Sequence, residues 1–193
     1  MGVKAPLVIQ KRDSTKAVSN TGPLISAFQS NSLVLLTKIL DRIYLPAACV
    51  AELVKHGWEN EIQAASSWLM EQRLNANEEK RALIFAERIA HHPSSKDAVV
   101  KNHLAEAQAI VLALRREHSD DLLLIDELAA REIANREAVN LSGFPGLLLL
   151  ARRLGLISPD DLKQKLELCR RQGTHYSEAF IKTVYEMANW DRR

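Results

Sequence analysis

The sequence predicts an α/β protein in which a short parallel sheet lies between two layers of helices. Short runs of branched apolar residues, such as residues 122–125, alternate along the chain with longer segments of helical periodicity. Strands that alternate with helices favour a parallel sheet, because each helical crossover returns the chain to the same end of the sheet. We therefore expect a three-layer α/β/α sandwich that ends in a helical C-terminal extension.

The length and composition fit one domain with an added helical segment. Of the 193 residues, 1–16 are expected to form an N-terminal leader or an edge strand, 17–157 the α/β domain, and 158–193 helices packed on the same domain. The formal net charge of +2 does not by itself indicate a nucleic-acid binder. The two cysteines lack CxxC spacing, and we find neither a membrane-spanning apolar run nor a secretory signal, so we expect a cytoplasmic protein.

Two strands are expected near the N-terminus, each followed by a polar side chain of interest. Residues 17–19 form the first, and Asn20 comes directly after it. Pro23 suits the first turn of the next helix, where its missing N–H would have no partner. Residues 42–46 form the second strand, and Glu52 lies early in the helix that follows. The helices expected in this part of the chain cover residues 33–40 and 47–56.

Residues 59–118 are helical in pattern, with interruptions at 75–77 and 92–95 and a turn or short edge strand at 73–75. Glu106 is an acid on the apolar side of this region. At 100° per residue it lies within about 40° of Ile110 and Ala113, whereas Gln108 lies opposite. A buried carboxylate is costly unless a cation, hydrogen bonds or a helix N-terminus receives it, which favours a functional role for Glu106.

The apolar run of residues 122–125 reads as a strand buried on both faces, and it stops at Asp126. In open α/β sheets, ligands bind at the carboxyl ends of the strands, so Asp126 is placed for chemistry. The alternative is that Asp126 caps a helix that begins at Glu127. The elements expected after it are a helix to about residue 136, a strand at 138–141, a turn at 142–146, and helices at 147–154, 160–171 and about 177–189.

Three acids and one amide therefore lie near strand ends or helix starts: Asn20, Glu52, Glu106 and Asp126. A set of oxygen ligands suits Mg²⁺ or Mn²⁺, which can activate water for attack on phosphorus. The sequence has no phosphate-binding GxxxxGK[ST] motif and no Ser-His-Asp or Cys-His order. Asn20 has an equally good alternative role as a helix N-cap or turn residue.

Four short motifs containing these positions follow one another from about residue 17 to the C-terminus. They are Val18-Ser19-Asn20-Thr21-Gly22-Pro23-Leu24-Ile25, Leu45-Pro46 with Glu52, Ala105-Glu106-Ala107-Gln108-Ala109-Ile110, and Leu123-Leu124-Ile125-Asp126-Glu127 with Arg131. Their order resembles that of the PIN-domain nucleases, and more closely the VapC-like toxin branch. The resemblance implies a three-layer α/β/α sandwich, metal-dependent ribonuclease activity and, in toxin–antitoxin members, a small antitoxin protein.

Carried over by position, the resemblance makes Asn20, Glu52, Glu106 and Asp126 the catalytic and metal-binding residues, with Thr21 and Arg131 as substrate-binding residues. The chain departs from the family pattern in three places. Asn20 stands where an aspartate is common, which removes one negative charge. Ala105 stands where the branch often has glycine, and Phe144-Pro145 replaces a Thr-Leu pair whose hydroxyl could hold phosphate.

The leading hypothesis is an endoribonuclease of toxin type that uses Mg²⁺ or Mn²⁺ to hydrolyse RNA phosphodiester bonds. The alternative is a catalytically weakened PIN module that binds RNA or a protein, and it is motivated by Asn20 and Phe144. A third option is a phosphatase or other metal hydrolase on an α/β fold. For Arg131 a surface ion pair is the competing role. The leucine run at 147–150 suits a homodimer or an antitoxin contact, or simply the core.

Overall fold

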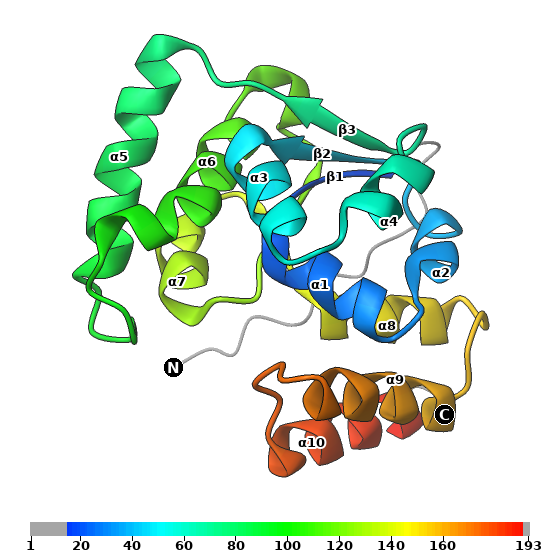
Figure 1. Ribbon diagram of the computed structural model, residues 1–193. Helices are drawn as coiled ribbons and strands as arrows, with labels where there is room; N and C mark the ends of the chain where they lie inside the picture. The colour runs from blue at the N-terminus through cyan, green and yellow to red at the C-terminus, as the bar shows by residue number, and fades with distance from the viewer. Residues whose placement is uncertain (1–14, 191–193) are drawn as a thin grey trace.

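The computed structural model describes residues 15–190, and its centre is a five-stranded parallel sheet (Figure 1). The strand order across the sheet is β3-β2-β1-β4-β5, and every neighbouring pair is parallel. The predicted parallel sheet is therefore confirmed. The strands are β1 (Lys16–Ser19), β2 (Arg42–Pro46), β3 (Leu69–Gln72), β4 (Leu122–Leu124) and β5 (Asn140–Ser142).

Helices cover both faces of this sheet, which confirms the predicted three-layer sandwich. The helices on one face are α1 (Thr21–Gln29), α2 (Leu33–Thr37), α3 (Ala47–Lys55), α4 (Glu59–Ala64), α8 (Phe144–Arg153), α9 (Pro159–Arg171) and α10 (Glu178–Trp190). The helices on the other are α5 (Ala76–Ala90), α6 (Leu104–Ala113) and α7 (Leu128–Arg136). Two 3₁₀ turns, η1 (Val100–His103) and η2 (Arg116–His118), flank α6.

Alternating side chains of the central strands supply the two hydrophobic cores. Ala17 of β1 and Leu122 and Leu124 of β4 belong to the core beneath α1, α3 and α8. Val18 and Leu123 point the opposite way, into the core beneath α5, α6 and α7. Because β4 is buried on both faces, it reads as a continuous apolar run, as a central parallel strand should.

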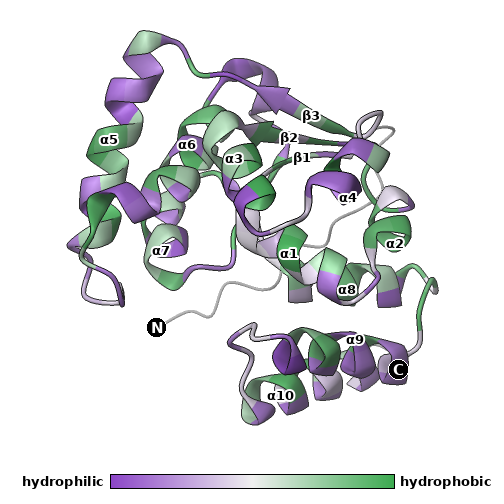
Figure 2. Ribbon diagram, viewed as in Figure 1, coloured by the Kyte–Doolittle hydropathy of each residue, from purple (hydrophilic) through white to green (hydrophobic). Residues whose placement is uncertain are grey.

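The C-terminal helices pack on the sandwich rather than standing apart from it. Helices α9 and α10 contact each other and α8, and α9 also contacts α1. A capping box starts α9, in which the Ser158 side chain accepts from the Asp161 backbone and the Asp161 side chain accepts from the Ser158 backbone. Figure 2 shows hydrophilic and hydrophobic residues alternating along α5, α9 and α10, as in amphipathic helices.

Several predicted boundaries differ from the structure. The edge strand expected at 73–75 is β3 at Leu69–Gln72, where Leu69 alone is fully buried and the apolar pattern is therefore weak. Helix α8 begins at Phe144 rather than 147, with Pro145 in its first turn. Of the predicted N-terminal leader, residues 1–14 lie outside the described residues, and Lys16 belongs to β1. Among the described residues, we find no helix both long enough and apolar enough to cross a membrane.

The direction of the chain through the sheet reverses next to β1. From β1 the chain moves outward through β2 to β3, and it then returns to form β4 on the other side of β1. Open α/β sheets bind ligands at the carboxyl ends of their strands, at the point where the strand order reverses, and here that point lies between β1 and β4. Asn20 follows β1 directly and Asp126 follows β4 by two positions, so both lie at this point of the sheet.

Candidate active site

Asn20 connects the end of β1 to the helix that carries Glu106. Its backbone N–H continues the β1–β4 ladder by donating to the Leu124 carbonyl at 3.0 Å. Asn20 is in the N-cap position of α1, yet its side chain makes no capping hydrogen bond. Its Nδ2 instead donates to Glu106 Oε1 at 3.3 Å. The side chain therefore does not act as the helix cap that the sequence allows.

This pair leaves two buried oxygens without a hydrogen-bond donor, Asn20 Oδ1 and Glu106 Oε2. An unsatisfied buried acceptor costs about 1–3 kcal/mol, so the arrangement favours the arrival of a donor or a cation. Burial is the main cause that raises the pKa of Glu106 to about 7, and the negative charges of Glu52 and Glu127 raise it further. The charge of His103 opposes this rise, and the surroundings of Glu106 are electronegative on balance.

Glu52 lies in the same electronegative region, and Thr21 holds it there. The Thr21 hydroxyl, which is buried, donates to Glu52 Oε2 at 2.5 Å. The Glu52 side chain is 40% exposed, so one side of it faces solvent. Beneath both acids, burial raises the pKa of the Cys49 thiol, and the charges of Glu106 and Glu52 add to that rise. The charges of Glu52 and Glu106 therefore affect the same group, and the two carboxylates lie in one region of the structure.

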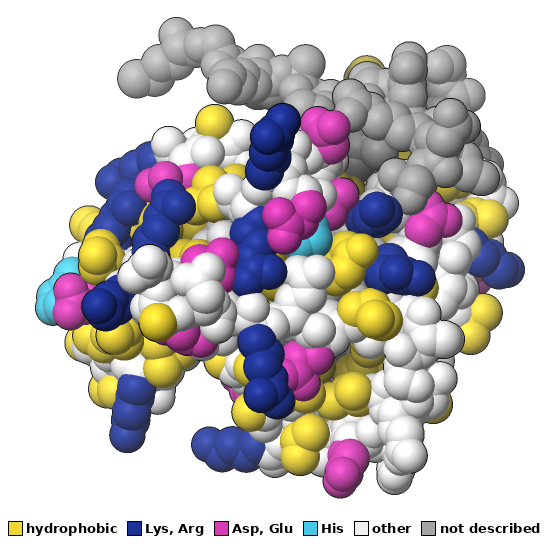
Figure 3. Space-filling model, turned by 90° about the horizontal axis from the view of Figure 1, so that it is seen from above, with side chains coloured by type: hydrophobic (Ala, Val, Ile, Leu, Met, Phe, Trp, Pro, Cys, Tyr) yellow, Lys and Arg dark blue, Asp and Glu magenta, His cyan; other side chains and the backbone are white. Residues whose placement is uncertain are grey.

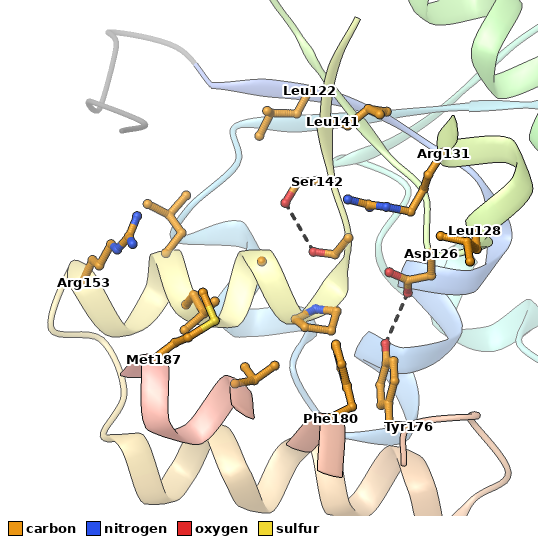
Figure 4. A pocket seen from close by; sticks show the side chains of 16 residues that line it. Leu122, Asp126, Leu128, Arg131, Leu141, Ser142, Arg153, Tyr176, Phe180 and Met187 are labelled. Atoms are coloured by element: carbon orange, nitrogen blue, oxygen red, sulfur yellow. Dashed lines mark hydrogen bonds between the residues drawn. The ribbon is translucent and has the colours of Figure 1, made fainter. Parts of the chain in front are cut away.

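Asp126 is held by two donors from distant segments, and Figure 4 shows the one from Tyr176. Its Oδ1 accepts from the Phe144 backbone N–H at 3.0 Å, and its Oδ2 accepts from the Tyr176 hydroxyl at 3.2 Å. Burial raises the pKa of Asp126 to about 6, against the opposing effects of these two donors and of the charge on Arg131. The competing role as a helix cap is wrong, because Glu127 caps α7 by accepting from the Ala130 N–H.

Gly22 lies between Asp126 and the Asn20–Glu106 pair. A Cβ built on Gly22 would lie 3.7 Å from Asp126 Cβ and 3.9 Å from Asn20 Oδ1, so both side chains border the same backbone position. Within residues 15–190, no three His, Cys, Asp or Glu side chains lie close enough together to hold a metal ion. The structure thus brings Asn20, Glu52 and Glu106 together and places Asp126 across Gly22, and a metal site here would need the amide oxygen of Asn20.

The two residues predicted to bind substrate occupy different positions. Arg131 Nη1 donates to the Ile125 carbonyl at 2.7 Å, and the side chain lines a cavity of about 540 Å³ beside Asp126. Thr21 is buried and faces Glu52. The roles of both residues in binding substrate stay predictions.

Two residues of the site were missed by sequence reasoning. Tyr176 reaches Asp126 from the loop between α9 and α10, and its hydroxyl also lies 3.3 Å from Ser26 Oγ. A separation of 50 residues from Asp126 leaves no periodic or motif signal. Glu127 was noticed only as the start of a helix, yet its charge reaches Glu106. The only sequence signal for this role of Glu127 is its position directly after Asp126.

Comparison with known families agrees with this geometry. A family model described as a PIN domain (DUF3368) matches residues 16–189, which is nearly the whole chain. The protein therefore belongs to the PIN-domain family, whose members are generally nucleases and typically use divalent metal ions. Comparison with curated proteins and with solved structures gives no significant match.

The raised pKa of Asp126 predicts a pH-dependent gain in stability from Asp126→Asn. The folded pKa of about 6 exceeds the ordinary value of 3.8, so ionisation of Asp126 destabilises the fold. This cost is absent below about pH 4 and complete above about pH 6. Chemical denaturation in EDTA measures the free energy of unfolding of the variant minus that of the unchanged protein. We expect this difference to be about 1–3 kcal/mol more favourable to the variant at pH 7.5 than at pH 4. An equal difference at both pH values contradicts the raised pKa of Asp126. The control is Glu87→Gln, which changes an exposed acid on α5.

Removing the Tyr176 hydroxyl is expected to raise the pKa of Asp126 above about 6, because Tyr176→Phe deletes a donor that favours the ionised carboxylate. Carbon-detected NMR titration of the aspartate carboxyl groups measures the shift. The matched control is Tyr185→Phe, which removes a hydroxyl that donates to Asp160 Oδ1 at 2.9 Å on the surface. A shift that is the same in both variants argues against a specific Tyr176–Asp126 contact.

Proposed function

We propose that this PIN-domain protein is a metal-dependent endoribonuclease of the toxin–antitoxin, VapC-like type, which hydrolyses RNA phosphodiester bonds. The observation that carries the proposal is the pair of buried oxygens, Asn20 Oδ1 and Glu106 Oε2, that have no donor at the carboxyl ends of β1 and β4. Buried acceptors without donors are uncommon in folded proteins and call for an explanation. A hard cation satisfies both at once.

Asn20, Glu52 and Glu106 would hold Mg²⁺ or Mn²⁺ on one side of Gly22, with Asp126 available from the other side. Carboxylate and amide oxygens are the ligands that these ions prefer. A cation here would also favour the ionised form of Glu106, whose pKa is otherwise about 7. Bound at this site, a divalent ion supplies activation of water and neutralisation of charge on the phosphate.

The surrounding residues have separate tasks in such a reaction. Asp126, with a pKa of about 6, can accept a proton at its carboxylate near neutral pH. Tyr176 orients that carboxylate through its hydroxyl, and Thr21 orients Glu52 in the same way. Arg131 lies beside Asp126 with a positive charge that can meet a phosphate oxygen.

RNA binding would depend on local contacts rather than on the overall charge. The chain carries a formal net charge of only +2. In the view of Figure 3, Lys and Arg side chains are interspersed with Asp and Glu over the visible face. Long-range attraction of a polyanion is therefore weak, and positioning of the RNA strand falls to side chains around the proposed metal ligands and Asp126.

Metal-dependent cleavage tests this proposal directly. With Mn²⁺ and single-stranded RNA, we expect Glu106→Gln to lower the cleavage rate by about 100-fold or more, because it removes a ligand charge at the orphaned oxygen pair. Glu87→Gln changes an exposed acid on α5 in the same way and should cleave like the unchanged protein. Equal cleavage by all three proteins, or cleavage that survives EDTA, removes the proposal. Hydrolysis of a simple phosphomonoester without RNA cleavage would point to a phosphatase instead.

A second candidate function is a catalytically weakened PIN module that binds RNA or a protein. Two observations favour it. Asn20 brings an amide in place of a carboxylate to the metal ligands, and Phe144 is fully buried and contributes only its backbone N–H to Asp126.

Asn20→Asp separates the two candidates, because it adds a negative charge beside Glu106. Calorimetric titration should show Mn²⁺ affinity rising on the order of tenfold, since ligand charge tunes the affinity of such sites. RNA cleavage that appears only in this variant assigns the unchanged protein to the binding class. Cleavage by the unchanged protein assigns it to the enzymes. No rise in affinity contradicts the placement of the ion.

The toxin assignment also implies a small antitoxin, and a homodimer remains part of the proposal. The leucine run that motivated both turns out to be mostly core: Leu147, Leu148 and Leu150 are buried. Growth arrest on expression, relieved by co-expression of an adjacent small protein, would support the toxin type.

A further inference from the structure

A cavity of about 540 Å³ is lined by Asp126 but not by Asn20, Glu52 or Glu106. Its walls come from β4 and the loop after it, the first turns of α7, strand β5, the whole length of α8, and Tyr176 with α10 (Figure 4). Asp126, Arg131, Ser142 and Tyr176 lie toward one end of the cavity, and Arg153 lies at the opposite end. The remainder is lined mainly by aliphatic and aromatic side chains. The cavity thus has an apolar middle between polar groups, and the carboxylate proposed for catalysis, Asp126, is one of them.

Two glycines give this end of the cavity its depth. A Cβ built on Gly143 would lie 2.3 Å from Asp126 Oδ1, and one on Gly146 would lie 2.5 Å from Ser142 Oγ. Any larger residue at either position would therefore displace a polar side chain of the cavity. The backbone at the start of α8 can approach Asp126 closely because position 143 is glycine, and it can approach Ser142 closely because position 146 is glycine.

Phe180 presents an aromatic ring at the mouth of the cavity. It is 40% exposed, and its ring is stacked against that of Tyr176, with 5.5 Å between centroids and 28° between planes. Tyr176 in turn is fixed by its hydrogen bonds to Asp126 and Ser26. The orientation of Phe180 is therefore tied to the catalytic acid, while part of its surface is left for a ligand.

From this arrangement we infer that the cavity receives one unpaired nucleobase of the RNA strand, next to the phosphodiester bond at Asp126. The inference rests on the proposed function and names a substrate subsite for it. A nucleobase is flat and aromatic, so it matches the apolar walls and can stack on Phe180. The polar edge of the base would meet Ser142 and Arg131. The phosphodiester bond beside that base would then lie at Asp126, because Asp126 belongs both to the cavity and to the candidate active site.

The test measures equilibrium binding, so it does not require cleavage. Fluorescence anisotropy in EDTA compares a short single-stranded RNA with the same RNA in which one nucleotide at a time lacks its base. For the unchanged protein, we expect one abasic position to weaken binding about 5- to 100-fold, which is the range for loss of one stacked base. Phe180→Ala should weaken binding of the intact RNA by a similar factor and should bind the abasic RNA as the unchanged protein does.

Two control variants separate stacking from a general loss of apolar surface. Phe180→Trp keeps an aromatic face and should retain preference for the intact RNA. Leu83→Ala removes a side chain that is 50% exposed on α5, away from the cavity, and should change nothing. Circular dichroism confirms that each variant is folded.

The inference is overturned if Phe180→Ala weakens binding of the intact and the abasic RNA equally, or weakens neither. It is also overturned if the substitution changes the oligomeric state, because the cavity would then be a contact between copies of the chain. Base-dependent binding without metal-dependent cleavage supports the subsite while removing the nuclease proposal. The two failures can therefore be told apart.

Discussion

The site depends on one constraint, which is that oxygens buried at the carboxyl ends of β1 and β4 must find positive partners. The β1–β4 pairing places Asn20 against Leu124, and α6 brings Glu106 to the Asn20 amide. That contact satisfies the amide nitrogen and one carboxylate oxygen only, so Asn20 Oδ1 and Glu106 Oε2 are left over. Burial makes this arrangement unfavourable in the absence of a cation, which is the usual cost of a pre-formed binding site.

The same constraint explains why the C-terminal helices pack on the domain that carries the candidate site. Asp126 is also buried and carries a raised pKa, and it obtains one donor from the start of α8 and one from the loop between α9 and α10. The helices at the end of the chain therefore contribute to the site through Tyr176, besides covering apolar surface. Loss of this packing would release the carboxylate even though β4 itself stayed intact.

The order of most strands and helices was predictable, as were the four positions near strand ends or helix starts, because apolar periodicity and turn residues are local signals. The reasoning for Glu106 was only partly right. Helix α6 is buried nearly all round, and Gln108, expected on its solvent side, is buried and bonded to Ala48 N and Glu79. The inward direction of Glu106 therefore follows from the burial of the whole helix, and the polar face assumed for it does not exist.

Contacts between distant segments could not be predicted in the same way. Tyr176 meets Asp126 only because α9 and α10 fold back over α8, and no spacing in the sequence records that. The sequence left a capping role open for Asp126, whereas the neighbouring acid Glu127 caps α7. The weak strand β3 was displaced by a few residues because one edge position alone is deeply buried.

The most direct measurement is anomalous diffraction from a crystal soaked in Mn²⁺. Our account predicts one strong peak within ligand distance of both Asn20 Oδ1 and Glu106 Oε2, on the side of Gly22 that faces Glu52. A peak bound elsewhere, or ordered side chains at this site with no peak at saturating Mn²⁺, would contradict it.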